Sequence, residues 1–216
     1  MLHHLGEKNS IFNQFIAELR DCGIQKDSMR FRRNIERLGE IFAYEISKFL
    51  PYETQKITTP LGELNMNLPA EQPVIATILR AGLPLHQGLL NYFDRAENAF
   101  ISAYRRYYND GNFEIQLDYM ASPDLNDKVL ILADPMLASG KSLLLVYEEI
   151  LKIYTPKHTH ITSIIASTEG LTLLQKHLNP KDVSIWIGAL DHELTAKYYI
   201  VPGLGDAGDL AYGPKK

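Results

Sequence analysis

The chain has 216 residues, of which 45% are hydrophobic and 22% are charged, as is typical of a single globular domain. Its 22 basic and 26 acidic side chains give a net charge of -4, which argues against a dedicated nucleic-acid binder. The single cysteine, Cys22, excludes an internal disulfide, and no apolar run approaches the roughly 18 residues of a membrane span. We therefore expect one cytoplasmic domain over residues 1–216. We expect no nucleic-acid or membrane partner.

Two amphipathic helices are predicted before residue 51. Apolar side chains recur every three to four residues over about 10–22 and again over 28–50. Asp27 or Ser28 is expected to cap the second helix, and Pro51 is expected to stop it. The apolar surface of these helices favours a homodimer or a higher homo-oligomer.

From residue 54 onward, short β-rich runs alternate with helical patterns. The runs cover 56–59, 74–79, 100–104, 128–134, 160–166 and 183–190, and the helical patterns cover 83–93, 142–154 and 171–178. Several runs are apolar almost throughout, as in strands that are covered on both faces. This alternation predicts an α/β fold with an open, mostly parallel sheet and flanking helices. Residues 105–127 interrupt it with a polar turn, for which an ordinary surface hairpin and a hinged flap are both open.

The segment 129–142 is the most informative, because an apolar strand leads through a loop directly into a helical pattern. A loop beyond the carboxyl end of a strand can present backbone N–H groups to a phosphate, and Ser139 and Ser142 add hydroxyls. A purely structural alternative stays open, in which Asp134 ends the strand, Pro135 turns the chain and Ser139 caps the helix.

A Walker A loop is a second interpretation of this segment, since Gly140, Lys141 and Ser142 match the end of that motif. Pro135 stands where the motif requires its first glycine. Proline has no N–H to donate and fixes φ, so the nucleotide cradle would be damaged, and a kinase or GTPase is disfavoured.

The same segment resembles the phosphoribosyl diphosphate (PRPP) motif of type I phosphoribosyltransferases, and its Asp-Pro form is similar to that of uracil phosphoribosyltransferases. The resemblance implies that the acid binds the ribose hydroxyls and that the loop binds the 5′-phosphate. The implied PRPP-binding residues are Asp134, Pro135, Met136, Leu137, Ala138, Ser139, Gly140, Lys141 and Ser142. Lys141 stands where the family usually has glycine, so its Cβ obstructs the loop or its ammonium helps to hold phosphate.

Two arginines also match the family. Residues 79–82 (Leu-Arg-Ala-Gly) resemble its diphosphate loop, and Arg105 follows a tyrosine as at the start of its mobile flap. Arginine suits this role because its paired donors bind the charge that accumulates on a leaving diphosphate. The resemblance implies that Arg80 and Arg105 bind PRPP, that Arg105 is catalytic, and that a β-hairpin flap of about 105–127 excludes water. Arg106 is adjacent, so an alignment shifted by one residue would assign this role to Arg106 instead of Arg105.

The glycine-rich tail, about 199–213, is similar almost residue for residue to the family's uracil-binding signature. Glycines let backbone N–H and C=O groups approach the O2, N3–H and O4 atoms of uracil. The implied uracil-binding residues are Ile200, Gly205, Asp206 and Ala207. Asp206 would also contact PRPP and act in catalysis, by orienting metal-bound water or by helping to deprotonate uracil N1. Leu210 stands where the family commonly has arginine.

The resemblance covers about residues 10–213 and implies transfer of the phosphoribosyl group of PRPP to N1 of uracil, giving UMP and diphosphate. Mg²⁺ is expected to arrive with PRPP, without metal ligands of the protein's own. Two alternatives remain: a regulatory protein of the same fold that senses PRPP and uracil, and a phosphoribosyltransferase for another base. The net charge of -4 counts against an RNA-acting regulator, and the uracil-like tail counts against another base.

Overall fold

The computed structural model describes the backbone of residues 1–107 and 113–214, and the side chains of 1–102 and 117–214. The strands of its main sheet are β1 (Leu2–His4), β4 (Val74–Leu79), β5 (Glu97–Tyr107), β6 (Phe113–Ala121), β7 (Val129–Ala133), β8 (Met136–Leu137), β9 (His158–Ser167) and β10 (Val183–Asp191). Their order is β1-β10-β9-β7-β4-β5-β6, and β8 pairs with β9. The described pairs are parallel except for β5 with β6, which confirms the predicted open, mostly parallel sheet.

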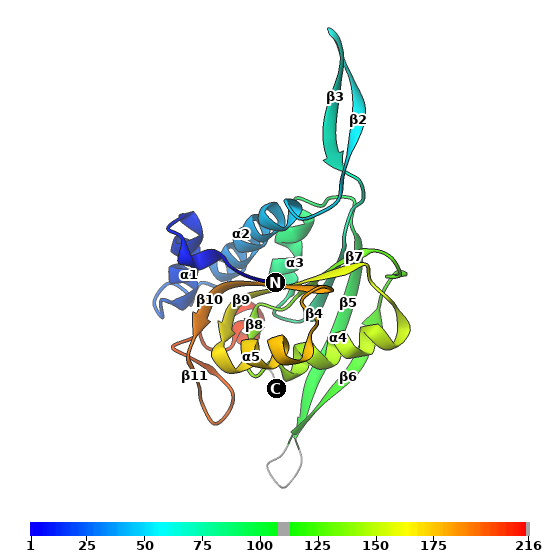
Figure 1. The fold of residues 1–216 in the computed structure, drawn as a ribbon. Coiled ribbons are helices and arrows are strands. Elements are labelled where there is room, and N and C mark those ends of the chain that lie inside the picture. The colour runs from blue at the N-terminus through cyan, green and yellow to red at the C-terminus, as the bar shows by residue number, and fades with distance from the viewer. Residues whose placement is uncertain (108–112, 215–216) are drawn as a thin grey trace.

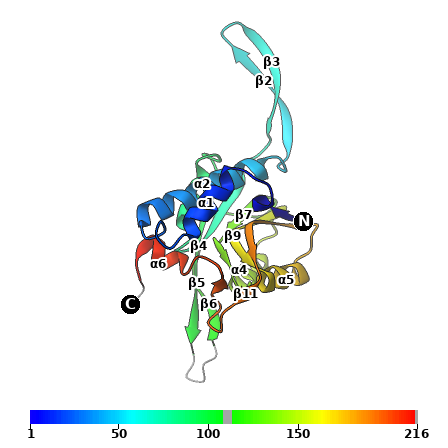
Figure 2. The same cartoon turned by 90° about the vertical axis from the view of Figure 1, so that its left-hand side faces the viewer.

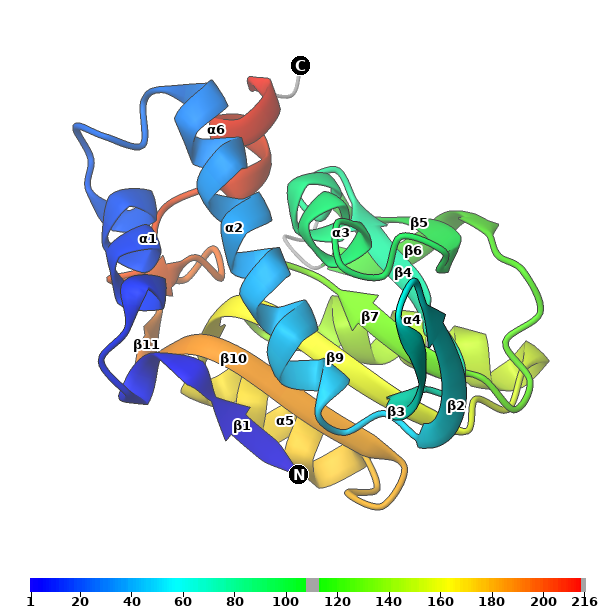
Figure 3. The same ribbon diagram turned by 90° about the horizontal axis from the view of Figure 1, so that it is seen from above.

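The helices are α1 (Ile11–Arg20), α2 (Ser28–Ser47), α3 (Leu83–Leu90), α4 (Lys141–Ile153), α5 (Thr168–His177) and α6 (Ala207–Tyr212), with a short 3-10 turn at Leu5–Glu7. They form two layers, with α1, α2, α3 and α6 on one face of the sheet and α4 and α5 on the other (Figures 1 and 3). Strand β7 shows why the strands are apolar throughout. Val129 and Ile131 join one core, whereas Leu130 and Leu132 join the other.

The N-terminal helices begin at side-chain caps. Asp27 accepts hydrogen bonds from the backbone N–H groups of Met29 and Arg30, at 3.0 and 3.1 Å, which satisfies two donors of the first turn of α2. Of the two predicted caps, Asp27 therefore fills this position and Ser28 is the first helical residue. The helix ends at Ser47, earlier than the predicted stop at Pro51.

One predicted strand lies elsewhere than expected. The run 56–59 belongs to β2 (Tyr52–Thr59), which pairs with β3 (Gly62–Pro69) in a separate two-stranded hairpin that projects from the body (Figures 1 and 2). The sequence did not indicate β3, because most of this strand is exposed and has no buried apolar face. It also did not indicate β1, a three-residue edge strand beside β10.

β5 and β6 pair in antiparallel orientation, so the polar segment 105–127 contains the expected hairpin. Residues 108–112 at its turn, and the side chains of 103–116, lie outside the described part of the chain. Closure of this hairpin as a flap stays a prediction. In the described residues, no helix combines the length and the apolar character that a bilayer span requires.

Candidate active site

The order of the strands creates a natural site for a ligand. The chain runs from β4 to β5 on one side and then returns to β7 on the other side, so the strand order reverses between β4 and β7. Open α/β sheets bind ligands beyond the carboxyl ends of strands at such a point. Thr77 of β4 pairs with Ala133 of β7, and these strands lead to Arg80 and Asp134. The fold thus brings both predicted residues to one edge.

A cavity of about 630 Å³ opens at this edge, between the strand ends and the C-terminal tail. Its described wall includes the predicted residues Arg80, Asp134, Met136, Ala138, Ser142, Ile200, Gly205, Asp206 and Ala207. It also includes Leu79, Ala81, Tyr199, Gly208 and Asp209, which lie in the predicted motifs without an assigned role, and Ile78, Lys197 and Tyr198, which lie outside those motifs. Asp209 could have been singled out as the second carboxylate of the glycine-rich tail, whereas Lys197 and Tyr198 belong to no motif.

The loop of residues 134–142, called the phosphate loop below, is held by the strand that follows it. The Asp134 carboxylate accepts a hydrogen bond from the N–H of Met136 at 3.2 Å. The Asp134 carbonyl accepts one from the Ser163 hydroxyl at 2.7 Å, and the Pro135 carbonyl accepts one from the Ile164 N–H at 3.0 Å. Because Ser163 and Ile164 lie on β9, the start of the loop is fixed to the sheet.

The far end of the phosphate loop rests on the start of α5. The Ser167 hydroxyl donates to the Ala138 carbonyl at 2.5 Å and accepts from the Gly170 N–H at 2.9 Å. Gly140 has φ of 77°, whereas Lys141 is not among the described non-glycine residues with positive φ and begins α4. Glycine is therefore required at 140 and not at 141, and the predicted obstruction by the Lys141 Cβ is wrong.

A smaller cavity of about 40 Å³ lies within the phosphate loop. Its described wall consists of Asp134, Met136, Leu137, Ala138, Ser139, Gly140, Ser142 and Leu143. Ser142 therefore borders both cavities, and Ser139 is buried. Of the predicted PRPP residues that the structure describes, Pro135 and Lys141 line neither cavity. The Lys141 ammonium lies 5.6 Å from the centre of the Tyr198 ring, toward the other side of the site.

Arg80 connects the end of β4 to the tail. Its Nη2 atom donates to the Asp209 carboxylate at 3.2 Å and to the Gly213 carbonyl at 3.3 Å. Its Nε atom is buried and has no hydrogen-bond partner among the described residues. Arg105 lies on β5, paired with Ile115, but its side chain is outside the described part, as is that of Arg106.

The tail crosses the cavity as a strand, a turn and a short helix. Ile200 lies on β12 (Ile200–Val201), which pairs with β11 (Glu193–Leu194). Gly205 has φ of 94°, a conformation that favours glycine. Asp206 caps α6 by accepting from the Asp209 N–H at 3.0 Å, which fixes the direction of its carboxylate. Leu210, in place of the family's arginine, packs partly buried against the core.

A separate cavity of about 510 Å³ lies between α2, α3 and β5. Its wall includes Arg32, His86, Phe100 and Tyr212. Burial lowers the pKa of His86 and raises that of Tyr212, although Arg32 and Arg80 oppose the shift at Tyr212. The described wall contains none of the predicted site residues. The cavity at the strand ends is therefore the candidate active site, because it unites the phosphate loop, Arg80 and the tail.

Comparison with known proteins identifies the family of the chain. Residues 7–214 match the family described as uracil phosphoribosyltransferase. A uracil phosphoribosyltransferase of Porphyromonas gingivalis is 55% identical over 212 residues, covering 98% of each chain. One of Pyrococcus furiosus is 38% identical over 210 residues, covering 96% of this chain and 88% of its own.

Solved structures show the same architecture. The AQ2163 protein of Aquifex aeolicus is 30% identical, with a TM-score of 0.86 over 99% of this chain and 98% of its own. A hypoxanthine phosphoribosyltransferase of Staphylococcus aureus, 12% identical over 76% of each chain with a TM-score of 0.51, shares the fold alone. Since the sequence matches extend over nearly the whole chain, the protein belongs to the uracil phosphoribosyltransferase family.

Proposed function

We propose that this protein transfers the phosphoribosyl group of PRPP to N1 of uracil, giving UMP and diphosphate. The observation that most supports this proposal is that the phosphate loop, Arg80 and the tail line one cavity. The chain also belongs to the uracil phosphoribosyltransferase family. In the reaction the bond from N1 to ribose C1 forms, the bond from C1 to the diphosphate oxygen breaks, and N1 loses its proton. Catalysis then depends on positioning the two substrates and stabilising the leaving group.

PRPP occupies the sheet side of the cavity in this proposal. The phosphate loop binds the 5′-phosphate through backbone N–H groups and the hydroxyls of Ser139 and Ser142, and Asp134 binds the ribose hydroxyls. Arg80 binds the diphosphate, which the place of this arginine on the cavity wall supports. The charge that develops on the diphosphate is then met by a group already in place.

Arg105 is the second proposed diphosphate ligand, and this assignment rests on the sequence. The hairpin of about 105–127 begins within β5, where Ser102 pairs with Leu79, a residue of the cavity wall. A flap that closed over the cavity would bring Arg105 to the leaving group and exclude water from a PRPP that is prone to hydrolysis. Arg105 would then act mainly in the transition state, so Arg105→Ala should lower kcat more than it weakens PRPP binding.

Uracil is proposed to bind against the tail, about residues 199–213. Ile200, Gly205 and Ala207 line the cavity, and in this proposal their main-chain N–H and C=O groups match the acceptor–donor–acceptor edge of uracil. Cytosine would leave buried groups unmatched, at a cost of about 1–3 kcal/mol each. Asp206 lies between this surface and the strand ends, where its carboxylate can receive the proton from N1.

Mg²⁺ fits the chemistry of this cavity as an ion that arrives with PRPP. Asp134, Asp206 and Asp209 place carboxylates on the wall, and Mg²⁺ is commonly bound by one or two carboxylates together with substrate phosphates. In the part of the chain that the structure describes, no group of three or more His, Cys, Asp or Glu side chains could hold a metal alone, so the ion would be held mainly by PRPP with Asp134 and Asp206 beside it. When bound, the ion supplies positive charge to the diphosphate as it leaves.

A homodimer in the cytoplasm is part of the proposal. Exposed apolar side chains on α2 and on the projecting hairpin, such as Tyr44, Leu61 and Met66, support association with a second copy. Light scattering coupled to size-exclusion chromatography should give twice the mass of one chain. A monomer at micromolar concentration would contradict this part.

The proposed reaction is tested by supplying PRPP, Mg²⁺ and one base at a time, and measuring nucleotide and diphosphate. We expect UMP from uracil and no product from cytosine, hypoxanthine or orotate. Folded protein that binds PRPP but forms no UMP would contradict the proposal and favour a metabolite-sensing protein. Product from another base would show that the tail does not select uracil.

A further inference from the structure

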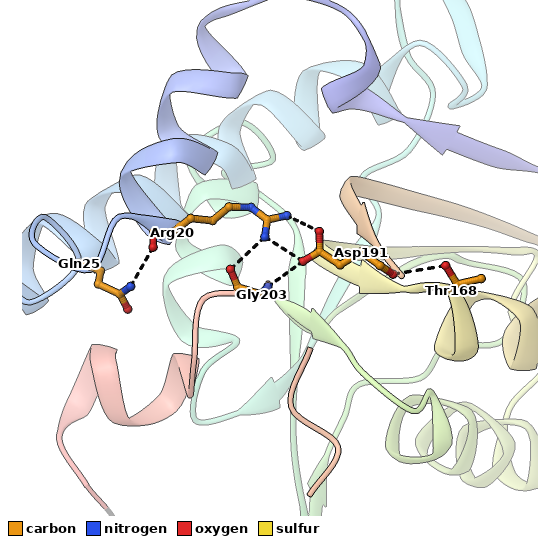
Figure 4. Close-up of polar contacts among 5 residues, drawn as sticks. All are labelled: Arg20, Gln25, Thr168, Asp191 and Gly203. Atoms are coloured by element: carbon orange, nitrogen blue, oxygen red, sulfur yellow. Dashed lines mark hydrogen bonds and ion pairs between the residues drawn. The ribbon is translucent and has the colours of Figure 1, made fainter. Parts of the chain in front are cut away.

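An ion pair lies behind the tail, outside the cavity. Arg20 is the last residue of α1 and Asp191 is the last residue of β10, 171 positions away. The guanidinium binds the carboxylate through two bonds of 2.8 Å, from Nη1 to Oδ2 and from Nη2 to Oδ1 (Figure 4). Asp191 is 6% exposed, so the pair is shielded from water on the side of the acid. Paired, charge-assisted bonds of this kind are stronger than neutral ones.

The same two side chains hold both polar backbone groups of Gly203. The Gly203 N–H donates to Asp191 Oδ2 at 2.9 Å, and the Gly203 carbonyl accepts from Arg20 Nη1 at 2.9 Å. Gly203 has φ of 55°, and a Cβ at this position would lie 2.1 Å from the Ile200 carbonyl oxygen. Glycine is therefore required here, and its orientation is fixed from both sides.

This contact reaches the base-binding surface through the chain itself. We call residues 200–206 the base loop. Gly203 lies at its centre, between Ile200 and Gly205, which line the cavity, and the adjacent Leu204 is buried in the core. Arg20 and Asp191 are not among the described residues of the cavity wall. Their side chains contact the base loop at Gly203.

We infer that Arg20 and Asp191 are positioning residues that fix the base loop for uracil, an inference that rests on the proposed function. Loss of Arg20 would leave the Gly203 carbonyl without its donor and the buried Asp191 carboxylate without its counter-ion. The backbone groups of residues 200–206 would then sample more orientations, so uracil would be bound less tightly and distinguished less well from cytosine. The phosphate loop has its own supports on β9 and α5 and would keep its affinity for PRPP.

The test compares Arg20→Ala and Arg20→Lys with the wild type by steady-state kinetics. We expect the KM for uracil to rise about tenfold in Arg20→Ala, while the KM for PRPP changes by less than about twofold. Product from cytosine, which we expect to be undetectable with the wild type, should become detectable with Arg20→Ala. Arg20→Lys keeps a cation that can reach one of the partners, so it should recover part of the uracil affinity. It is also the second variant should alanine prevent folding.

The chain offers a matched control in Arg30, which forms a similar two-bond pair with Glu18 of α1, at 3.0 and 2.9 Å. This pair joins α1 to α2, and among the described residues it forms no hydrogen bond or ion pair with the base loop. Arg30→Ala should lower the melting temperature without raising the KM for uracil. An equal rise of that KM in Arg20→Ala and Arg30→Ala would overturn the inference, because a general loosening of α1 would then be the cause.

Hydrogen exchange separates failure of this inference from failure of the proposed reaction. In the protein without substrates, Arg20→Ala should speed exchange of the amides of residues 200–206 and leave those of 134–142 unchanged. An unaltered base loop, or an unaltered KM for uracil, would overturn the inference even in an active enzyme. If the wild type makes no UMP, the proposed function fails and the uracil role fails with it, while exchange still decides whether the pair holds the loop.

Discussion

The phosphate loop and the base loop meet in one cavity but are held in different ways. The phosphate loop rests on β9 and α5, which follow it closely in the chain, through backbone groups and the hydroxyls of Ser163 and Ser167. The base loop is held by charged side chains from α1 and β10 (Figure 4). The hydroxyls that support the phosphate loop lie 29 residues from their partners, whereas the base loop is held by Asp191, 12 residues from Gly203, and by Arg20, which is 183 residues away. Only the base loop therefore depends on a contact with the far end of the chain.

This difference implies that the two halves can be altered separately. A change in the supports of the phosphate loop should affect PRPP, and a change in those of the base loop should affect uracil. Arg80 is the exception, because it leaves β4 beside the phosphate loop and contacts the tail at Asp209 and Gly213.

The largest effect is expected from Arg80→Ala. Loss of a donor to a developing charge costs about 10²–10³ in turnover, and loss of the tail contacts adds to this in uracil binding. We expect kcat/KM to fall by at least this factor for both substrates, as measured by diphosphate release. Arg80→Lys keeps the charge but lacks the paired donors, so its kcat/KM should lie between the values of the wild type and of Arg80→Ala. An effect confined to one substrate would remove Arg80 as the link between the halves.

Two glycines sharpen the comparison. A Cβ at Gly203 would lie 2.1 Å from the Ile200 carbonyl oxygen, and one at Gly140 would lie 2.9 Å from the Gly170 carbonyl oxygen. Both residues have positive φ, which alone costs about 1–2 kcal/mol for alanine. In urea unfolding we expect Gly203→Ala to lose more stability than Gly140→Ala.

The kinetic effects of these variants should also differ, with the KM for uracil raised by Gly203→Ala and the KM for PRPP raised by Gly140→Ala. Gly62→Ala in the projecting hairpin is the control, because a Cβ there meets nothing within 4 Å. Identical kinetic effects of the two site variants would contradict separate support of the two halves.

The residues of both halves that line the cavity could be singled out from the sequence, whereas the support of the base loop by Arg20 could not. Asp134 to Ser142 could be recognised as a candidate phosphate site because the strand, loop and helix are contiguous in sequence. Arg80 could be recognised because it directly follows an apolar strand. Arg20 looks like an ordinary arginine at a helix end, and its partner lies 171 residues away. The sequence also could not show that Gly140, and not residue 141, adopts the left-handed conformation, since that follows from packing against Gly170.

Acid should weaken the strand that supports the phosphate loop. His160 on β9 is 2% exposed, and its Nδ1 atom accepts from Trp186 Nε1 at 3.1 Å. Burial lowers the pKa of His160 to about 3, below its ordinary value of 6.5, so the unfolded chain binds the proton more readily. Stability is therefore complete above about pH 6.5 and falls as the pH decreases toward 3, by at most about 1.4 kcal/mol per unit from this group.

Urea unfolding at pH 7 and pH 5 measures this loss. His160→Asn retains a side-chain acceptor without the titrating ring, so the difference between the two pH values should become smaller. We expect the free energy of unfolding of the variant to retain some pH dependence, because burial also lowers the pKa values of His3 and His158. If the variant and the wild type lose equal stability, His160 is not the acid-sensitive group.

The smallest effect is expected from Lys141→Gly, which restores the residue usual in the family. Lys141 begins α4 with ordinary helical geometry, and glycine there costs at most about 1 kcal/mol of stability. The KM for PRPP should change by less than about threefold, because Lys141 lines neither cavity. A rise of about tenfold or more would assign the ammonium a direct role at the phosphate.

The crystal structure of the protein with UMP tests the central claim most directly, because UMP carries both the phosphate and the base in one molecule. We predict the 5′-phosphate at Ser139 to Ser142 and the uracil edge against the backbone of Ile200 to Ala207. A base bound in the separate cavity beside His86 and Tyr212, or a phosphate away from residues 134–142, would contradict the account.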